Sequence, residues 1–212
     1  MPEPHLTTYD APGRPRALVL MLHGGKERSE QRVTGRSASW RRCLAMQRAI
    51  ARPAEEAGVS TWLLRYGVVG WNDHRQPSPV PDARWALARA RERLGDVPVV
   101  LLGHSMGART AVHVADDPLV AGVVALAPWF PEGEPVRRLA GRHLVAAHGR
   151  GDRITSYGAT RQYVARARVV AASAEMVDMG RIGHYMLREI GAWNRLAIDR
   201  SLRMLGIDPS SG

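Results

Sequence analysis

Cysteine is almost absent from this sequence, which has a single one, Cys43, among its 212 residues. One thiol cannot form a disulfide within the chain, and it cannot supply a metal site built from several cysteines. Cys43 also falls within an apolar pattern of helical spacing, which favours a packed thiol over a reactive one. Redox chemistry is therefore not indicated as the function of this protein.

Long apolar runs are absent as well. No segment contains the roughly 18 consecutive apolar residues that a membrane-spanning helix needs. The first thirteen residues lack the apolar stretch, preceded by basic residues, that marks a secretory signal. We therefore expect a cytoplasmic protein that does not enter a membrane. The length and an apolar content of 45% are typical of one globular domain over residues 1–212.

Lysine is nearly absent, although the chain is strongly basic. Lys26 is the only lysine among 30 basic residues, and the formal net charge is +10. The arginines are spread along every segment and form no block of five, which favours a general bias in composition over a nucleic-acid surface. We expect no nucleic-acid partner. The charge leaves open the attraction of an anionic substrate, because a basic face raises the local concentration of anions.

Continuous apolar runs of strand length recur along the chain and alternate with segments of helical spacing. Continuous runs are typical of strands that are covered on both faces. The sequence therefore predicts an α/β fold, with a mostly parallel, doubly wound sheet flanked by helices and ligands at the carboxyl ends of the strands. Residues 128–141 are too few for a helical lid. The expected strands are residues 16–22, 60–66, 97–103, 120–127, 142–148 and 168–178.

The segment Gly103-His104-Ser105-Met106-Gly107 has the pattern of a nucleophile elbow. It follows an apolar run and precedes a stretch of small residues that is typical of a helix. Glycines two positions to either side of the serine allow a strand to turn sharply into a helix and leave the serine hydroxyl exposed. An ordinary strand-to-helix turn is the alternative, but the flanking pattern favours Ser105 as a nucleophile.

A serine hydroxyl needs an imidazole that accepts its proton and a carboxylate that orients the imidazole. Asp152 lies in the loop after the fifth expected strand, and His184 lies in the loop after the sixth. The order Ser, Asp, His along the chain is the one that this chemistry shows on sheets of this kind. Two alternatives stay open, because Asp152 could instead cap a helix that starts near Ser156, and Asp178 is a rival acid.

These motifs resemble those of the α/β-hydrolase superfamily, in particular a small, lidless, serine-esterase-like member. The resemblance covers residues 16–205 and rests on His23-Gly24, the elbow at Ser105, the His148-Gly149-x-x-Asp152 loop and Gly183-His184. It implies that Ser105 is the nucleophile, Asp152 the orienting acid and His184 the general base and acid. Three departures are expected: there is no lid, the strands that open fuller versions before residue 16 are missing, and the first motif is not a triple glycine.

The remaining site residues are predicted from their places at strand ends. One oxyanion donor is expected to be the N–H of Met106, and the second is the N–H of Gly25, with that of Lys26 as the alternative. Trp71, Trp129, Phe130 and Tyr185 are candidates for the walls of an apolar substrate pocket, although the same residues also fit a hydrophobic core. No histidine pair has metal-ligand spacing with a third carboxylate, so we expect neither a metal nor another cofactor.

The sequence thus predicts a serine hydrolase that cleaves a small carboxylic ester or thioester through an acyl-enzyme on Ser105. Acyl transfer or perhydrolysis by the same three residues is an alternative, and so is a non-catalytic binding protein of the same fold. The expected partner is a small-molecule substrate. The sequence indicates no oligomeric state.

Overall fold

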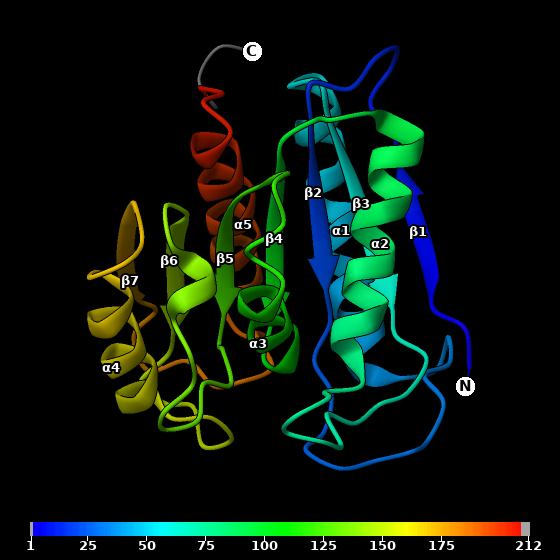
Figure 1. The fold of residues 1–212 in the computed structure, drawn as a ribbon. Coiled ribbons are helices and arrows are strands. Elements are labelled where there is room, and N and C mark those ends of the chain that lie inside the picture. The colour runs from blue at the N-terminus through cyan, green and yellow to red at the C-terminus, as the bar shows by residue number, and fades with distance from the viewer. Residues whose placement is uncertain (1, 209–212) are drawn as a thin grey trace.

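The computed structural model describes residues 2–208, so residues 1 and 209–212 of the expected domain lie outside the description. Within it the strands form one seven-stranded sheet in the order β1-β3-β2-β4-β5-β6-β7 (Figure 1). Only β1 runs antiparallel to its neighbour, and the predicted mostly parallel, doubly wound sheet is confirmed. The strands are β1 His5–Tyr9, β2 Ala17–Leu22, β3 Val59–Arg65, β4 Val99–His104, β5 Val120–Leu126, β6 His143–His148 and β7 Ser173–Asp178.

Helices cover both faces of the sheet, and this explains why its central strands are apolar throughout. Helices α1 and α5 lie on one face, while α2, α3 and α4 lie on the other (Figure 1). Every residue of β2 and of β4 is buried, because a strand covered on both faces has no position that faces water. The helices are α1 Ala38–Glu56, α2 Pro79–Leu94, α3 Met106–His113, α4 Tyr157–Ala167 and α5 Ile190–Met204.

The expectation that no strand precedes residue 16 is wrong. Strand β1 pairs antiparallel with β3, from His5 opposite Arg65 to Tyr9 opposite Thr61. It lies at the edge of the sheet, and none of its five residues is fully buried. A half-exposed edge strand needs no continuous apolar run, so its short polar sequence gave no signal of the kind that marked the central strands.

The last expected strand is shorter than predicted. Residues 168–172 form the turn after α4, and β7 begins only at Ser173. Val169 lies in that turn with 85% of its surface exposed, so its apolar side chain extends the apolar run in the sequence without being part of a strand. β7 is the other edge of the sheet, and its partly exposed positions explain the weak pattern.

The connection between β5 and β6 contains only a single turn of 3₁₀ helix, η1 Arg137–Leu139. The predicted absence of a helical lid in this connection is therefore correct. No helix in the described part of the chain has both the length and the apolar character to cross a bilayer.

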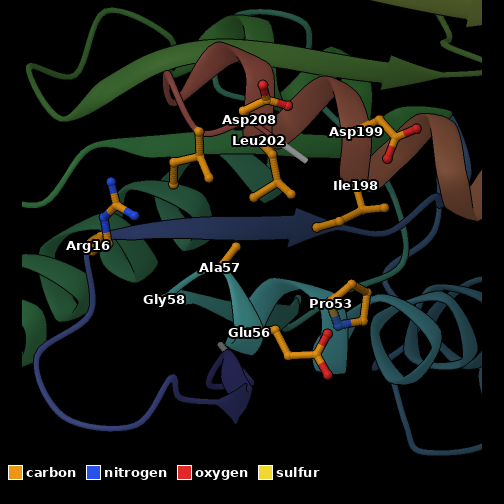
Figure 2. Close-up of a pocket in the computed structure, with 10 residues that line it drawn as sticks. Arg16, Pro53, Glu56, Ala57, Gly58, Ile198, Asp199, Leu202 and Asp208 are labelled. Carbon is orange, nitrogen blue, oxygen red and sulfur yellow. The ribbon is translucent and has the colours of Figure 1, made fainter. Parts of the chain in front are cut away.

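Two cavities lie at opposite edges of the sheet. One of about 190 Å³ lies at the carboxyl edge, beside Ser105. A larger one of about 470 Å³ lies at the opposite edge, between the carboxyl ends of α1 and α5. Figure 2 shows the second cavity, with Ile198, Leu202 and Asp208 on one side, Pro53 and Glu56 on the other, and Arg16 at the start of β2. Since parallel sheets bind reactants at their carboxyl edge, the smaller cavity is the candidate active site.

Candidate active site

Ser105 occupies a strained turn between β4 and α3. Its φ of 55° and ψ of −117° lie outside the regions that a side chain tolerates easily. The two glycines of the motif allow the turn to form. A Cβ on Gly103 would lie 2.5 Å from the Cα of Ala108, and one on Gly107 would lie 2.0 Å from the carbonyl oxygen of Leu22. The elbow thus packs directly against the end of β2.

Ser105, His184 and Asp152 form one chain of hydrogen bonds. The Nε2 atom of His184 lies 3.0 Å from the Oγ of Ser105, and its Nδ1 atom lies 2.7 Å from the Oδ2 of Asp152. All three side chains are at most 7% exposed. Nδ1 faces a carboxylate, so it carries the ring proton and leaves Nε2 free to accept the serine proton.

The carboxylate of Asp152 is held by an unusually complete set of donors. Oδ1 accepts the backbone N–H groups of Ile154 and Thr155, while Oδ2 accepts from His184, from the Thr155 hydroxyl and from the Nε2 of His148. Burial raises the pKa of this carboxyl, but the hydrogen bonds from His148, His184, Thr155 and Ile154 outweigh it and hold the pKa well below the ordinary value. Asp152 is therefore ionised throughout the physiological range.

The geometry distinguishes the two alternatives for the acid, which are a helix-capping role for Asp152 and the use of Asp178 in its place. The helix near residue 156 is capped by Ser156, whose Oγ accepts the N–H of Ala159, so Asp152 does not serve as that cap. Asp178 accepts the N–H of Gly180 and pairs with Arg150 at 3.0 Å. Asp178 thus forms the strand-end turn, and Asp152 is the acid that contacts His184.

The loops that carry Asp152 and His184 touch through their backbones. A Cβ on Gly149 would lie 2.1 Å from the carbonyl oxygen of Ile182. The N–H of Arg150 donates to the carbonyl of Gly180 at 2.7 Å. The glycine after His148 is thus required for close approach, and this contact fixes the separation between the loops of Asp152 and His184.

Two further histidines are buried beside the elbow and hold its turns. His23 accepts the N–H of Tyr66 at Nε2, and the Nε2 of His104 lies 3.0 Å from the carbonyl of His184. Burial lowers the pKa of His23 to about 4. Burial, followed by the neighbouring His184, lowers that of His104 to about 3. Both rings are therefore neutral in the folded protein at neutral pH.

Stability is expected to fall on mild acidification because of these two rings. Between pH 7 and pH 5 the unfolded chain, in which histidine titrates near 6.5, binds more protons than the folded chain, so stability decreases as the pH falls. The loss is about 2 kcal/mol per histidine at pH 5. Urea unfolding at both pH values measures it. His104→Gln should reduce the slope and the exposed control His74→Gln should not, whereas equal stability at both pH values would contradict the assignment.

The cavity beside Ser105 is mainly apolar and joins segments that are far apart in the sequence. His184, Tyr185 and Leu187 lie on one side, and Tyr185 and Leu187 are 59% and 67% exposed. The other lining residues are Gly24, Gly25, Ala38, Ser39, Arg42, His104 and Ser105. Of the four residues expected to wall a substrate pocket, only Tyr185 lines this cavity.

The other three expected wall residues lie elsewhere. Trp71 is completely buried, and Phe130, 3% exposed, stacks on Tyr163 with ring centroids 4.0 Å apart. Trp129 is half-buried, and the guanidinium of Arg109 lies over its ring and over that of Trp71, 4.5 Å and 4.0 Å from the ring centroids. These aromatic side chains belong to the packing beneath the carboxyl edge, because each has a partner in the interior.

Arg109 also forms a buried ion pair. Among the ion pairs of the described residues, we expect this one to matter most for stability. Its Nε lies 2.6 Å from Glu134, and the two side chains are 7% and 1% exposed. His113 contacts the other oxygen of the same carboxylate. Arg109→Met should lower the free energy of unfolding by about 3–5 kcal/mol, because it leaves a buried carboxylate short of a partner.

The matched control is Arg84→Met, which removes an exposed pair with Asp116. Exposed pairs contribute about 0–1 kcal/mol, so this variant should unfold close to wild type in urea. Equal losses in the two variants would contradict a special role for the buried pair.

Two site residues were not predicted from the sequence. Thr155 donates to Asp152 and lies 3.2 Å from the Nδ1 of His184. Arg42 donates from Nη2 to the carbonyl of Met186 at 2.9 Å and from Nε to that of Tyr185 at 3.3 Å. The position of Thr155, three residues after Asp152, is a feature of the sequence from which its contact with the carboxylate could have been predicted. Nothing local marked Arg42, which reaches the site only because α1 begins beside the His184 loop.

The protein combines a lidless α/β sheet with a buried serine, histidine and aspartate in hydrogen-bond contact. This combination is typical of hydrolase-like proteins. The family model described as the alpha/beta hydrolase family matches residues 19–205. The chain belongs to this family. No curated protein matches the sequence.

Solved structures of low sequence identity share the fold. A serine hydrolase homologue from Coxiella burnetii has a TM-score of 0.70 at 16% identity, over 93% of this chain and 91% of that one. A serine hydrolase without a lid from Xanthomonas campestris has a TM-score of 0.64 at 15% identity, over 95% and 94%. The butyrate-bound esterase Est2 from Thermogutta terrifontis has a TM-score of 0.71 at 15% identity, over 99% and 92%.

Proposed function

We propose that this protein is a serine hydrolase that cleaves small carboxylic esters or thioesters through an acyl-enzyme on Ser105. The observation that carries the proposal is the continuous path from the Oγ of Ser105 through His184 to Asp152, beside a cavity that opens to solvent. Family membership supports the reaction class.

In the first half of the reaction, His184 Nε2 accepts the proton of Ser105 as the Oγ attacks the acyl carbonyl. The resulting imidazolium protonates the leaving alcohol or thiol, and the acyl group stays on Ser105. In the second half His184 takes a proton from water, the hydroxide adds to the acyl carbon, and the carboxylic acid leaves as Ser105 regains its proton. Asp152 stays ionised and stabilises the imidazolium in both halves.

The oxyanion of each tetrahedral intermediate is proposed to be held by the N–H groups of Met106 and Gly25. Met106 is the first residue of α3, so its N–H has no partner within the helix. Gly25 lines the cavity and packs so closely on Met106 that a Cβ would lie 2.4 Å from its Cε. The alternative, Lys26, is disfavoured because its N–H donates to Val69 at 3.0 Å.

The size and polarity of the cavity support a small acyl or alcohol group. Its volume of about 190 Å³ is below the range of roughly 300–1,000 Å³ that is typical of sites for drug-sized ligands. One of the fold neighbours is an esterase with butyrate bound, a short acyl group. Water reaches an open, lidless cavity easily, which favours hydrolysis over acyl transfer to another acceptor.

Labelling with a fluorophosphonate probe, followed by intact mass, tests the proposal. Wild type should gain one phosphonyl group, and Ser105→Ala should gain none, because the probe reacts with an activated serine. Well-folded wild type that takes up no label would overturn the hydrolase function and favour a binding role for the same fold. A panel of short esters and thioesters then identifies the preferred acyl group.

A further inference from the structure

A single permanently charged side chain lines the cavity beside Ser105, and it belongs to Arg42 of α1. Its guanidinium is fixed in place, since Nε and Nη2 donate to the carbonyls of Tyr185 and Met186. The third nitrogen of the guanidinium, Nη1, takes part in neither of these bonds. An arginine held in this way has lost most of its conformational freedom before a ligand arrives, so less entropy is lost on binding.

Arg42 has no counter-ion in the part of the chain that the structure describes. None of the cavity-lining residues is an aspartate or a glutamate, and the described ion pairs do not include Arg42. Buried Arg109, in contrast, pairs with Glu134. Arg42 is half-buried, so its charge is partly desolvated, and this burial lowers the pKa of its guanidinium. A partly desolvated cation without a counter-ion favours an anion in the adjoining cavity.

The start of α1 adds positive potential to the same cavity. Ala38 and Ser39, the first residues of this 19-residue helix, line the cavity, and the first turn contains no acidic side chain. The side chain of Ser37 does not cap the helix. The partial positive charge at the helix start therefore adds to that of Arg42.

The neighbouring His104 adds no positive charge to the cavity. Its side chain is 5% exposed and lines the cavity, and its Nδ1 atom has no hydrogen-bond partner in the described structure. The ring is neutral and donates from Nε2 to the carbonyl of His184, so Nδ1 is an acceptor. Because Nδ1 is enclosed and accepts hydrogen bonds, it does not bind an anion, and the positive charge at this cavity comes from Arg42 and the start of α1.

We infer that the substrate is a small ester that carries a free carboxylate near the scissile bond, and that Arg42 binds this carboxylate. The inference rests on the proposed function and narrows its substrate class. Half-esters of short dicarboxylic acids place the carboxylate on the acyl side, and acylated hydroxy acids place it on the alcohol side. The net charge of +10 raises the local concentration of either substrate.

Two matched pairs of esters test the inference in a pH-stat. Methyl hydrogen glutarate is compared with methyl pentanoate, and acetoxyacetate is compared with isobutyl acetate, so each pair differs by one carboxylate. In at least one pair, Arg42→Gln should lower the ratio of kcat/KM for the anionic over the neutral ester by about tenfold, the effect of one charge-assisted hydrogen bond. Arg42→Lys should retain part of that ratio.

The matched control is Arg41→Gln, because Arg41 is the exposed neighbour on α1 and does not line the cavity. This variant should leave both ratios at the wild-type value. If Arg42 only holds the His184 loop, Arg42→Gln will slow both members of each pair equally, and that result overturns the inference. Neutral turnover without any anionic preference overturns it too. If wild type neither takes up the phosphonate nor hydrolyses any of the four esters, the proposed function itself fails.

Discussion

Replacing Ser105 with alanine is expected to lower kcat for ester hydrolysis by about six orders of magnitude, the loss seen when a triad nucleophile is removed from a serine protease. The variant has no group that can form the acyl-enzyme, while the cavity and the proposed oxyanion donors stay in place. Initial rates on the best ester of the panel measure the effect.

The fold of this variant should be unaffected, because the described hydrogen bonds of the Ser105 side chain consist of the one with His184. Thermal unfolding at or above the wild-type temperature is the control. Residual activity above roughly 1% in a preparation free of wild type would assign the chemistry to another nucleophile, since the oxyanion hole alone accelerates hydrolysis far less.

Asp152→Asn is expected to lower kcat by about 10⁴, as in the corresponding serine-protease variant. The amide can present a donor where His184 now finds an acceptor, so the ring adopts the wrong tautomer and Nε2 can no longer accept the serine proton. The variant should also lose some stability, because Oδ1 accepts two backbone N–H groups and Oδ2 accepts from two histidines.

Asp178→Asn is the matched control, since it changes the rival acid in the same way. Asp178 contacts Gly180 and Arg150, so this variant should retain activity within a fewfold of wild type. A large loss in Asp178→Asn together with full activity in Asp152→Asn would reverse the assignment. Both variants are compared by kcat and by urea unfolding, so that a loss of fold is separated from a loss of chemistry.

The sequence predicted the features that follow from buried strands and sharp turns. Continuous apolar runs identified the central strands, because burial on both faces removes polar positions. Ser105, Asp152 and His184 were found from loops at strand ends, since parallel strands bring their carboxyl ends to one edge. The structure places all three side chains in contact, and their catalytic roles stay predictions until the variants are measured.

The features that the sequence did not predict depend on how segments pack over long distances. Trp71 and Phe130 follow strands just as pocket residues do, but Trp71 packs with Arg109 and Phe130 with Tyr163. Arg42 is one of many arginines, and only the position of α1 beside the His184 loop distinguishes it. Strand β1 was missed because an edge strand can be short and polar without losing its hydrogen bonds to the sheet.

The backbone contact between Gly149 and Ile182 has a consequence for how substrate enters and product leaves. Because the two loops meet without an intervening side chain, we expect them to move together and not one at a time. We then expect substrate and product to pass over Tyr185 and Leu187, the exposed side chains that line the cavity. Exchange of reactants needs only rotation of surface side chains, which takes nanoseconds or less, so opening of the site is not expected to limit turnover.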